Sequence, residues 1–273
     1  MIGTSCIVFE DIDGKEQRLD TSGRFNNAYN ADCMEFLKAC PDKFFNLAIV
    51  DPPYGGSDYK GSIVGWFGGR FENYHLGEVG GGIAQPEIKA ERTGRTWAKK
   101  YQVHEGGVFS RDIRSWDIAP PKEYFEELSR VSENQIIWGG NYFGLPPTRC
   151  FLVWKKLTIS ENFTMAMCEY AWTSFNDNAK LFECAPQGKD RFHPTQKPIA
   201  LYEWILKRYA KEGDRILDTH LGSGSSRIAA YNLNMDFVGT EADKTYFDLE
   251  EQRFDKHTAQ ASLFVDQLAV TLD

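Results

Sequence analysis

The 273-residue sequence lacks several features that would place it in a common protein class. No apolar run reaches 18 residues, so no membrane-spanning helix is predicted. The first six residues lack the basic and apolar regions of a signal peptide, which favours a cytoplasmic protein. Six cysteines are present but none forms a Cys-x-x-Cys pair, which argues against a structural zinc site and a redox dithiol. We expect reduced thiols and no bound metal.

Positive charge is also scarce. The 31 Lys and Arg residues are outnumbered by 39 Asp and Glu residues, giving a net charge of −8. This balance is unusual for a nucleic-acid-binding protein, because cationic side chains supply much of the affinity for phosphate, although only the field at the contact surface matters. Residues 89–100 are the most basic stretch, with Arg92, Arg95, Lys99 and Lys100. A DNA-contacting segment and a solvated charged loop are both open interpretations.

The most informative stretch is Asp51-Pro52-Pro53-Tyr54, which follows the apolar run 47–50. This pattern predicts a buried strand that ends at the surface, where ligands bind in open α/β sheets. The two prolines supply no backbone donors and fix the chain, so the motif offers two oxygen acceptors and one aromatic ring. An exocyclic amine on adenine or cytosine complements that array. A simple proline turn after a strand is the alternative.

A second motif lies near the C-terminal end. A predicted strand over 215–218 leads into a loop with Gly222 and Gly224 and then into a helix. The loop is not a phosphate-binding Walker loop, and Arg227 stands where a dinucleotide fingerprint has its third glycine. Glu241 follows Asp218 by 23 residues, which is the ribose-binding position of a doubly wound nucleotide site. A nucleoside ligand without a phosphate therefore fits better than a dinucleotide.

These two motifs together resemble those of the amino-group DNA methyltransferases. The stretch His193-Pro194-Thr195-Gln196-Lys197-Pro198 resembles the element that lines their cofactor pocket. Because the acceptor motif precedes the glycine loop, the order resembles their circularly permuted β group. The resemblance implies an α/β fold with a doubly wound, mostly parallel, Rossmann-like seven-stranded sheet in a single methyltransferase domain over 1–273. One departure is Thr219-His220, where many relatives have Pro-Phe.

The resemblance also implies roles for individual residues. It assigns the catalytic site to Asp51, Pro52, Pro53 and Tyr54. It implies S-adenosyl-L-methionine as the cofactor, bound by Asp32, Thr195, Lys197, Asp218, His220, Gly222, Ser223, Gly224, Ser225 and Glu241. Helix capping by Asp32 and packing of His220 are the structural alternatives.

The expected reaction is direct methyl transfer to the N6 atom of an adenine that has been flipped out of duplex DNA. Asp51, rather than Ser, favours adenine by resemblance. N4 of cytosine and an amine in RNA are the alternatives. A protein-glutamine methyltransferase would resemble Asn-Pro-Pro-Tyr with the glycine loop placed first, and a non-enzymatic DNA-binding protein would have one motif spoiled; neither pattern is present.

Two segments lie outside the expected core. Residues 55–110 hold 13 of the 24 glycines and show no periodicity, so 55–115 is interpreted as an inserted recognition segment or lid, or else a disordered insertion. Residues 257–273 form a tail in which Gln260–Phe264 resembles the peptides that dock bacterial proteins into the sliding clamp; packing of Leu263 and Phe264 is the alternative. The expected partner is double-stranded DNA, and a homodimer is compatible with the sequence.

Overall fold

We analysed the protein as a computed structural model, which describes residues 6–55, 118–161, 166–186 and 191–270, with side chains described up to residue 260. The predicted insertion 55–115, apart from Gly55, lies outside these residues, and so do Arg92, Arg95, Lys99 and Lys100. Among the described helices, none is long and apolar enough to span a bilayer.

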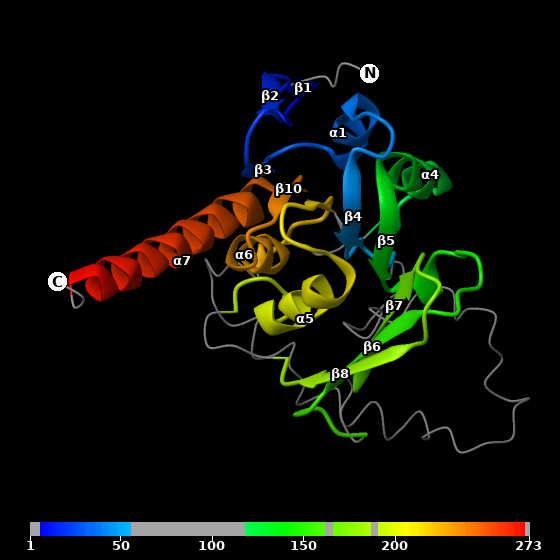
Figure 1. The fold of residues 1–273 in the computed structure, drawn as a ribbon. Coiled ribbons are helices and arrows are strands. Elements are labelled where there is room, and N and C mark those ends of the chain that lie inside the picture. The colour runs from blue at the N-terminus through cyan, green and yellow to red at the C-terminus, as the bar shows by residue number, and fades with distance from the viewer. Residues whose placement is uncertain (1–5, 56–117, 162–165, 187–190, 271–273) are drawn as a thin grey trace, which may run out of the picture.

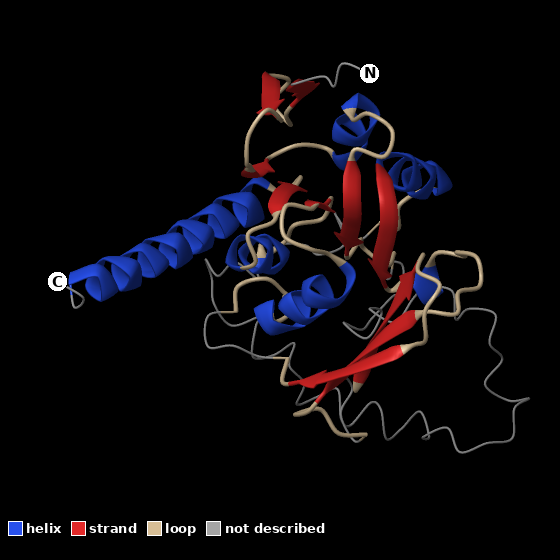
Figure 2. Cartoon of the chain, viewed as in Figure 1, coloured by secondary structure: helices blue, strands red, loops and turns tan. Residues whose placement is uncertain are grey.

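A mixed sheet forms the centre of the molecule (Figures 1 and 2). Its strand order is β3-β10-β9-β4-β5-β7-β6-β8. The five strands from β3 to β5 are mutually parallel, β7 runs antiparallel to both its neighbours, and β8 is parallel to β6. The strands are β3 (Asn26–Tyr29), β4 (Phe45–Val50), β5 (Ser132–Trp138), β6 (Phe151–Lys156), β7 (Cys168–Thr173), β8 (Lys180–Cys184), β9 (Arg215–Asp218) and β10 (Asp236–Thr240).

The doubly wound, mostly parallel arrangement confirms the predicted fold class, but the described sheet has eight strands rather than seven. The two outermost strands are the ones least evident in the sequence. β3 is a short Asn-Asn-Ala-Tyr segment that is fixed by parallel pairing with β10. β8 alternates between exposed and half-buried residues and pairs with β6. Tertiary pairing stabilises such edge strands, whose own sequences carry little signal.

Helices cover both faces of the sheet (Figure 1). α1 (Cys33–Ala39) and α4 (Lys122–Val131) pack on one face, and α5 (Ile199–Tyr209) and α6 (Ser225–Asn232) pack on the other. Strand β4 shows how the two cores are separated. Ala48 and Val50 belong to the first core, whereas Leu47 and Ile49 belong to the second. Side chains alternate across a strand, so one apolar run fills both layers.

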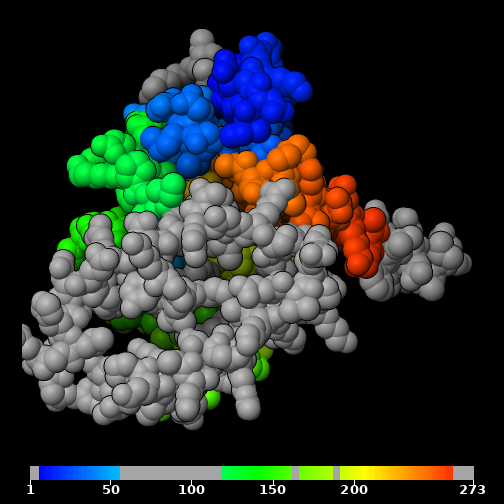
Figure 3. Space-filling model, turned by 180° about the vertical axis from the view of Figure 1, so that it is seen from behind, coloured from blue at the N-terminus to red at the C-terminus, as the bar shows by residue number. Residues whose placement is uncertain are grey.

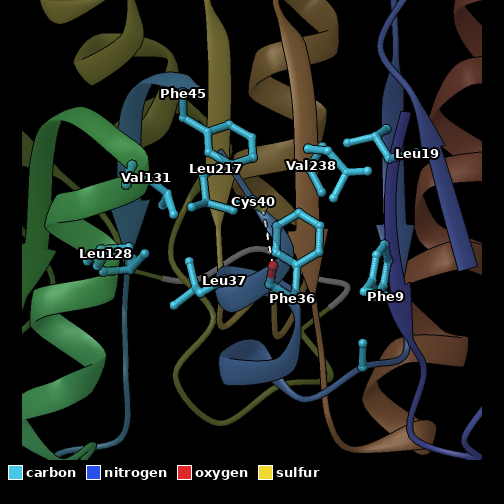
Figure 4. Close-up of a cluster of buried hydrophobic side chains, with 14 of the residues drawn as sticks. Phe9, Leu19, Phe36, Leu37, Cys40, Phe45, Leu128, Val131, Leu217 and Val238 are labelled. Carbon is cyan, nitrogen blue, oxygen red and sulfur yellow. Dashed lines mark hydrogen bonds between the residues drawn. The ribbon is translucent and has the colours of Figure 1, made fainter. Parts of the chain in front are cut away.

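The first core joins the N-terminal hairpin and helices α1 and α4 to the sheet (Figure 4). Phe36 and Leu37 of α1 are fully buried against Phe45 and Leu128. The hairpin of β1 (Cys6–Glu10) and β2 (Glu16–Asp20) closes this core with Phe9, whose ring meets that of Phe36 edge-on at 4.9 Å. Burying one large apolar side chain contributes about 1.5–3 kcal/mol, so this cluster anchors the hairpin to the sheet.

The chain ends in one long helix, α7 (Lys244–Val270), which extends away from the body of the molecule (Figures 1 and 3). Residues 257–270 of the predicted tail continue this helix. Gln260–Phe264 is helical in its backbone. Docking of this segment into a sliding clamp stays a prediction.

Strands β4 and β9 bring the two sequence motifs together. They are adjacent and parallel, with Leu47 opposite Ile216 and Ala48 opposite Leu217. Asp51 follows the end of β4, and Asp218 ends β9. Since parallel strands end at the same edge of a sheet, the acceptor motif and the glycine loop meet there despite being more than half the chain apart.

Candidate active site

A cavity of about 340 Å³ opens at this edge of the sheet. The acceptor motif 51–54 lines it on one side, and the glycine-loop residues 219–223 line it on another. The start of α1, the 193–197 segment and the first turn of α7 complete the wall. All four predicted catalytic residues face this cavity, and its volume lies in the range of small-molecule sites.

The acceptor motif is held by an aromatic cluster. Tyr54 donates its hydroxyl proton to Asp51 Oδ1 over 2.8 Å, and its ring stacks on Tyr142 with centroids 4.9 Å apart. Gly139, at φ +67°, allows this contact, because a Cβ at that position would lie 2.2 Å from the Tyr54 ring. A larger residue would displace the ring, so Gly139 sets the position of Tyr54.

Asp51 lies at one end of a row of buried charges. Lys197 Nζ bonds to Asp51 Oδ2 and lies 3.2 Å from Glu169 Oε2. Lys156 Nζ contacts the other oxygen of Glu169 at 2.5 Å. Lys197 and Lys156 are only 3% and 4% exposed, and charges so deeply buried require partners. The four groups alternate in sign, so the row as a whole is neutral.

Three members of this row, Asp51, Glu169 and Lys197, have shifted pKa values. Burial raises the pKa of Asp51, and repulsion from Glu169 adds to that effect while Lys197 opposes it. Burial also acts to raise the pKa of Glu169, but its two lysines outweigh burial and lower the pKa overall. Burial alone would lower the pKa of Lys197, but attraction from the two carboxylates raises it. Lys197 is therefore cationic across the physiological range.

The glycine loop is ordered by its own backbone bonds to Glu241. One carboxylate oxygen of Glu241 accepts from the Gly222 N–H at 2.8 Å, and the other accepts from the Asp243 N–H at 2.9 Å. Burial raises the pKa of Glu241 to about 7. Glu241 lies on the cavity wall, as predicted for a ribose-binding acid, and it also fixes the loop. Its ligand contact stays a prediction.

His193 supports the loop from the opposite side. It is 9% exposed, its ring meets that of Tyr246 edge-on at 4.3 Å, and a Cβ on Gly222 would lie 3.2 Å from it. Its Nδ1 accepts from the Thr195 backbone N–H at 3.3 Å, which places the ring proton on Nε2. Burial lowers the pKa of His193 to about 3, so the ring is neutral at pH 7.

Asp32 and His220 each have a structural role beside the cavity. Asp32 is the N-cap of α1 and accepts from the Met34 and Glu35 N–H groups. His220 meets the ring of Tyr124 edge-on, and its Nδ1 lies 3.0 Å from Thr219 Oγ1. Both residues also line the cavity. The capping and packing alternatives are therefore realised, and both side chains are still placed where they can meet a ligand.

Two predicted cofactor residues, Asp218 and Gly224, are set back from the cavity wall, and their contact with the cofactor stays a prediction. Asp218 is 2% exposed, accepts from Ser226 Oγ at 2.5 Å and from the His220 N–H at 3.1 Å, and has its pKa raised by burial to about 7. Gly224 is the left-handed N-cap of α6 and packs against Glu250. Both shape the loop from behind, while Gly222, Ser223 and Ser225 line the cavity.

Lys197 lies on the acceptor side of the cavity. It lines the cavity with Thr195, but its ammonium group is held by Asp51 and Glu169 at the acceptor side. Glu169 and Lys156 were not among the predicted site residues. Their sequence signal is weak: β7 has one glutamate and β6 ends in two lysines, and such charges are also common in strands with one solvated face. Only the antiparallel pairing of β6 and β7 brings the two together.

Residues 137–252 match the model of the DNA methylase family, a span from β5 into α7 that includes the Pro-Thr-Gln-Lys-Pro element and the glycine loop. The type II methyltransferase M2.MboI of Moraxella bovis is 24% identical over 85% of this chain and 88% of its own length. The type II methyltransferase M.BglII of Bacillus subtilis is 26% identical, over 83% of this chain and 68% of its own. Over residues 137–252 the chain is therefore similar to the N6/N4 DNA methylase family.

The solved structure of the M1.HpyAVI–SAM complex aligns over 83% of this chain and 98% of that chain, with 19% identity and a TM-score of 0.43. The DNA methylase family model ends inside α7 and begins after the acceptor motif. The family match therefore does not include Asp51. Its place in the site rests on the structure, in which β4 and β9 end side by side.

Proposed function

We propose that this protein transfers a methyl group from S-adenosyl-L-methionine to the exocyclic N6 atom of an adenine flipped out of duplex DNA. The observation that supports this most directly is the shared cavity. The acceptor array of Asp51, Pro52 and Tyr54 and the loop fixed by Glu241 line one space. Two substrates that must meet during transfer are thereby given adjoining binding surfaces.

The residues present fit the cofactor. Glu241 and Asp32 supply carboxylate acceptors for a ribose and an amine, and Thr195 lies on the same wall. Helix α6 begins at Ser225 with no side-chain cap, and a helix N-terminus favours the carboxylate of an amino acid. Bound there, S-adenosyl-L-methionine supplies an electrophilic methyl group on a sulfonium centre.

The acceptor motif prepares the amine for attack. Asp51 and the Pro52 carbonyl accept the two N–H hydrogens of the amine, which favours a pyramidal nitrogen with an available lone pair. Tyr54, positioned by Gly139 and Tyr142, gives the extruded base an aromatic surface. Rate is gained mainly from positioning, and the surplus proton leaves the amine afterwards, through Asp51 to water.

Adenine is proposed over cytosine because the first motif residue is Asp51 rather than serine. The family whose model matches residues 137–252 includes both N6 and N4 enzymes. Its relatives are named type II methyltransferases, which supports a role in a restriction–modification pair. For the DNA contact we propose Arg92, Arg95, Lys99 and Lys100, on the strength of their local charge in the sequence.

The test is transfer of radiolabelled methyl groups from S-adenosyl-L-methionine to long unmethylated bacteriophage DNA. The unaltered protein labels the duplex, and Asp51→Asn does not, while both bind the cofactor in calorimetry. Asp42→Asn, which changes a largely exposed aspartate ahead of β4, is the matched control and keeps its activity. Labelling only of heat-denatured DNA or of RNA would replace the duplex substrate; no labelling of any nucleic acid would contradict the proposal.

A further inference from the structure

The buried charges behind Asp51 come from four separate segments. Asp51 follows β4, Lys197 precedes α5, Glu169 belongs to β7 and Lys156 ends β6. Lys197 Nζ also lies 5.2 Å from the centroid of the Trp138 ring. These contacts leave the ammonium group enclosed by two carboxylates and an indole. The four residues are far apart in the sequence, so only the fold brings them into contact.

Stability is a weak explanation for such a row. Removing charges from water costs several kcal/mol per ion, and well-packed apolar residues of similar size are often as stabilising or more so. Here Lys156 and Glu169 place charges on β6 and β7 at positions where apolar side chains could pack instead. The row ends on the one carboxylate that the proposed function requires to accept an amine. A functional reason for burying it is therefore the better explanation.

We propose that Lys197 and Glu169 are positioning residues that fix the orientation and charge of Asp51, with Lys156 holding Glu169 in place. This rests on the proposed function, in which Asp51 receives the amine hydrogen. Lys197 keeps the buried carboxylate ionised and fixes Oδ2, while Tyr54 fixes Oδ1. Glu169 shares Lys197, so the ammonium group does not cancel the charge that Asp51 presents to the substrate.

Several other groups face Asp51. Tyr54 donates to it from the same motif, Asp218 of β9 repels it, and Tyr202 of α5 lies close enough for its own ionisation to be opposed by Asp51. Asp218 and Tyr202 add no positive charge. Within the described residues, the cation in contact with Asp51 is Lys197, and the second carboxylate that binds this cation is Glu169.

The proposal predicts opposite effects for two conservative substitutions. Lys197→Gln removes the attracting charge and raises the pKa of Asp51. Glu169→Gln removes a repelling charge and leaves Lys197 to Asp51 alone, so it lowers that pKa. Charges at this range move a pKa by about one unit or more. A purely structural role would disturb the site in both variants without moving the pKa of Asp51 in opposite directions.

The pKa can be measured without any activity. Protein labelled with 13C at the aspartate carboxyl carbon is titrated by NMR, and the Asp51 signal is identified by its absence in Asp51→Asn. Lys155→Gln and Glu183→Gln are the matched controls, because they change a neighbouring, half-exposed pair on β6 and β8. The controls leave the Asp51 midpoint unchanged. Glu169→Gln keeps the side-chain shape. If Lys197→Gln does not fold, the Asp51 midpoint in Glu169→Gln alone tests the proposal.

Activity supplies a second, separate readout. The acidic limb of the kcat/KM profile reports the free enzyme's Asp51, so it moves up in Lys197→Gln and down in Glu169→Gln. Unmoved Asp51 signals in both variants, or shifts in the same direction, would overturn the proposal even if the unaltered protein methylates DNA. Opposite NMR shifts in a protein that methylates no nucleic acid would instead uphold the charge row and remove the proposed function.

Discussion

The contact between Gly139 and Tyr54 gives a sharp test of how the acceptor motif is built. Gly139→Ala introduces a Cβ 2.2 Å from one ring carbon of Tyr54 and 2.6 Å from another. Carbon atoms pack at about 3.5–4.0 Å, so the ring must move by more than 1 Å. The Tyr54 side chain can turn away, but it then leaves Tyr142 and its bond to Asp51.

The magnitude follows from these losses. An alanine in the left-handed region costs about 1–2 kcal/mol. Loss of the aromatic stack adds about 0.5–1.5 kcal/mol, and loss of the hydrogen bond adds a similar amount. Gly144 is a matched control, because it has φ +63° but a Cβ there meets nothing within 4 Å. Gly144→Ala therefore shows the backbone cost alone.

We expect Gly139→Ala to lower the free energy of unfolding by about 1–3 kcal/mol more than Gly144→Ala does, as measured by urea denaturation. Methyl transfer falls by at least about tenfold in Gly139→Ala and stays near the unaltered level in Gly144→Ala. In the Tyr54→Ala background, adding Gly139→Ala costs no more than Gly144→Ala. Equal stabilities and full activity in both single variants would refute the assigned role of Gly139.

Three further substitutions test other parts of the account. Asp32→Ser keeps an N-cap oxygen for α1, so we expect the melting temperature to stay within a few degrees while cofactor affinity falls; unchanged affinity would leave Asp32 a cap alone. His193 stays neutral in the folded protein and binds a proton in the unfolded chain, so stability falls as the pH drops from about 6.5 towards about 3. In His193→Asn we expect the slope of the unfolding free energy against pH to change by about 1.4 kcal/mol per pH unit in that window. An unchanged slope would contradict the assignment. Arg227→Met strands the buried Glu250 and costs about 3–5 kcal/mol in urea denaturation, part of which Glu250→Gln restores; no restoration would show that the loss arises elsewhere.

The sequence predicts those parts of the fold in which one segment carries its own signal. The apolar run 47–50, the Asp32 cap with its amphipathic helix, and the glycine loop before α6 were all predicted from local pattern, and each lies where it was expected. The short strand β3 could not be predicted, because its Asn-Asn-Ala-Tyr sequence has no strand pattern and the strand depends on pairing with β10.

The site divides in the same way. Asp51 and the glycine loop could be identified from motifs, because each motif is continuous in the chain. Glu169 and Lys156 could not, since their contact depends on the register of β6 with β7 and on the approach of Lys197 from another segment. Asp218 could be identified as the acid that ends β9, but its bonds to Ser226 and His220 could not; its contact with the cofactor stays a prediction. Side-chain direction at a strand end is set by packing.

The most direct test of the central claim is the identity of the methylated base. Unmethylated duplex DNA is incubated with the protein and S-adenosyl-L-methionine, digested to nucleosides and analysed by mass spectrometry, beside Asp51→Asn. The account predicts N6-methyladenine with the unaltered protein and none with the variant. N4-methylcytosine would keep the acceptor chemistry but contradict the proposed base, and the absence of any methylated nucleoside would contradict the proposed function.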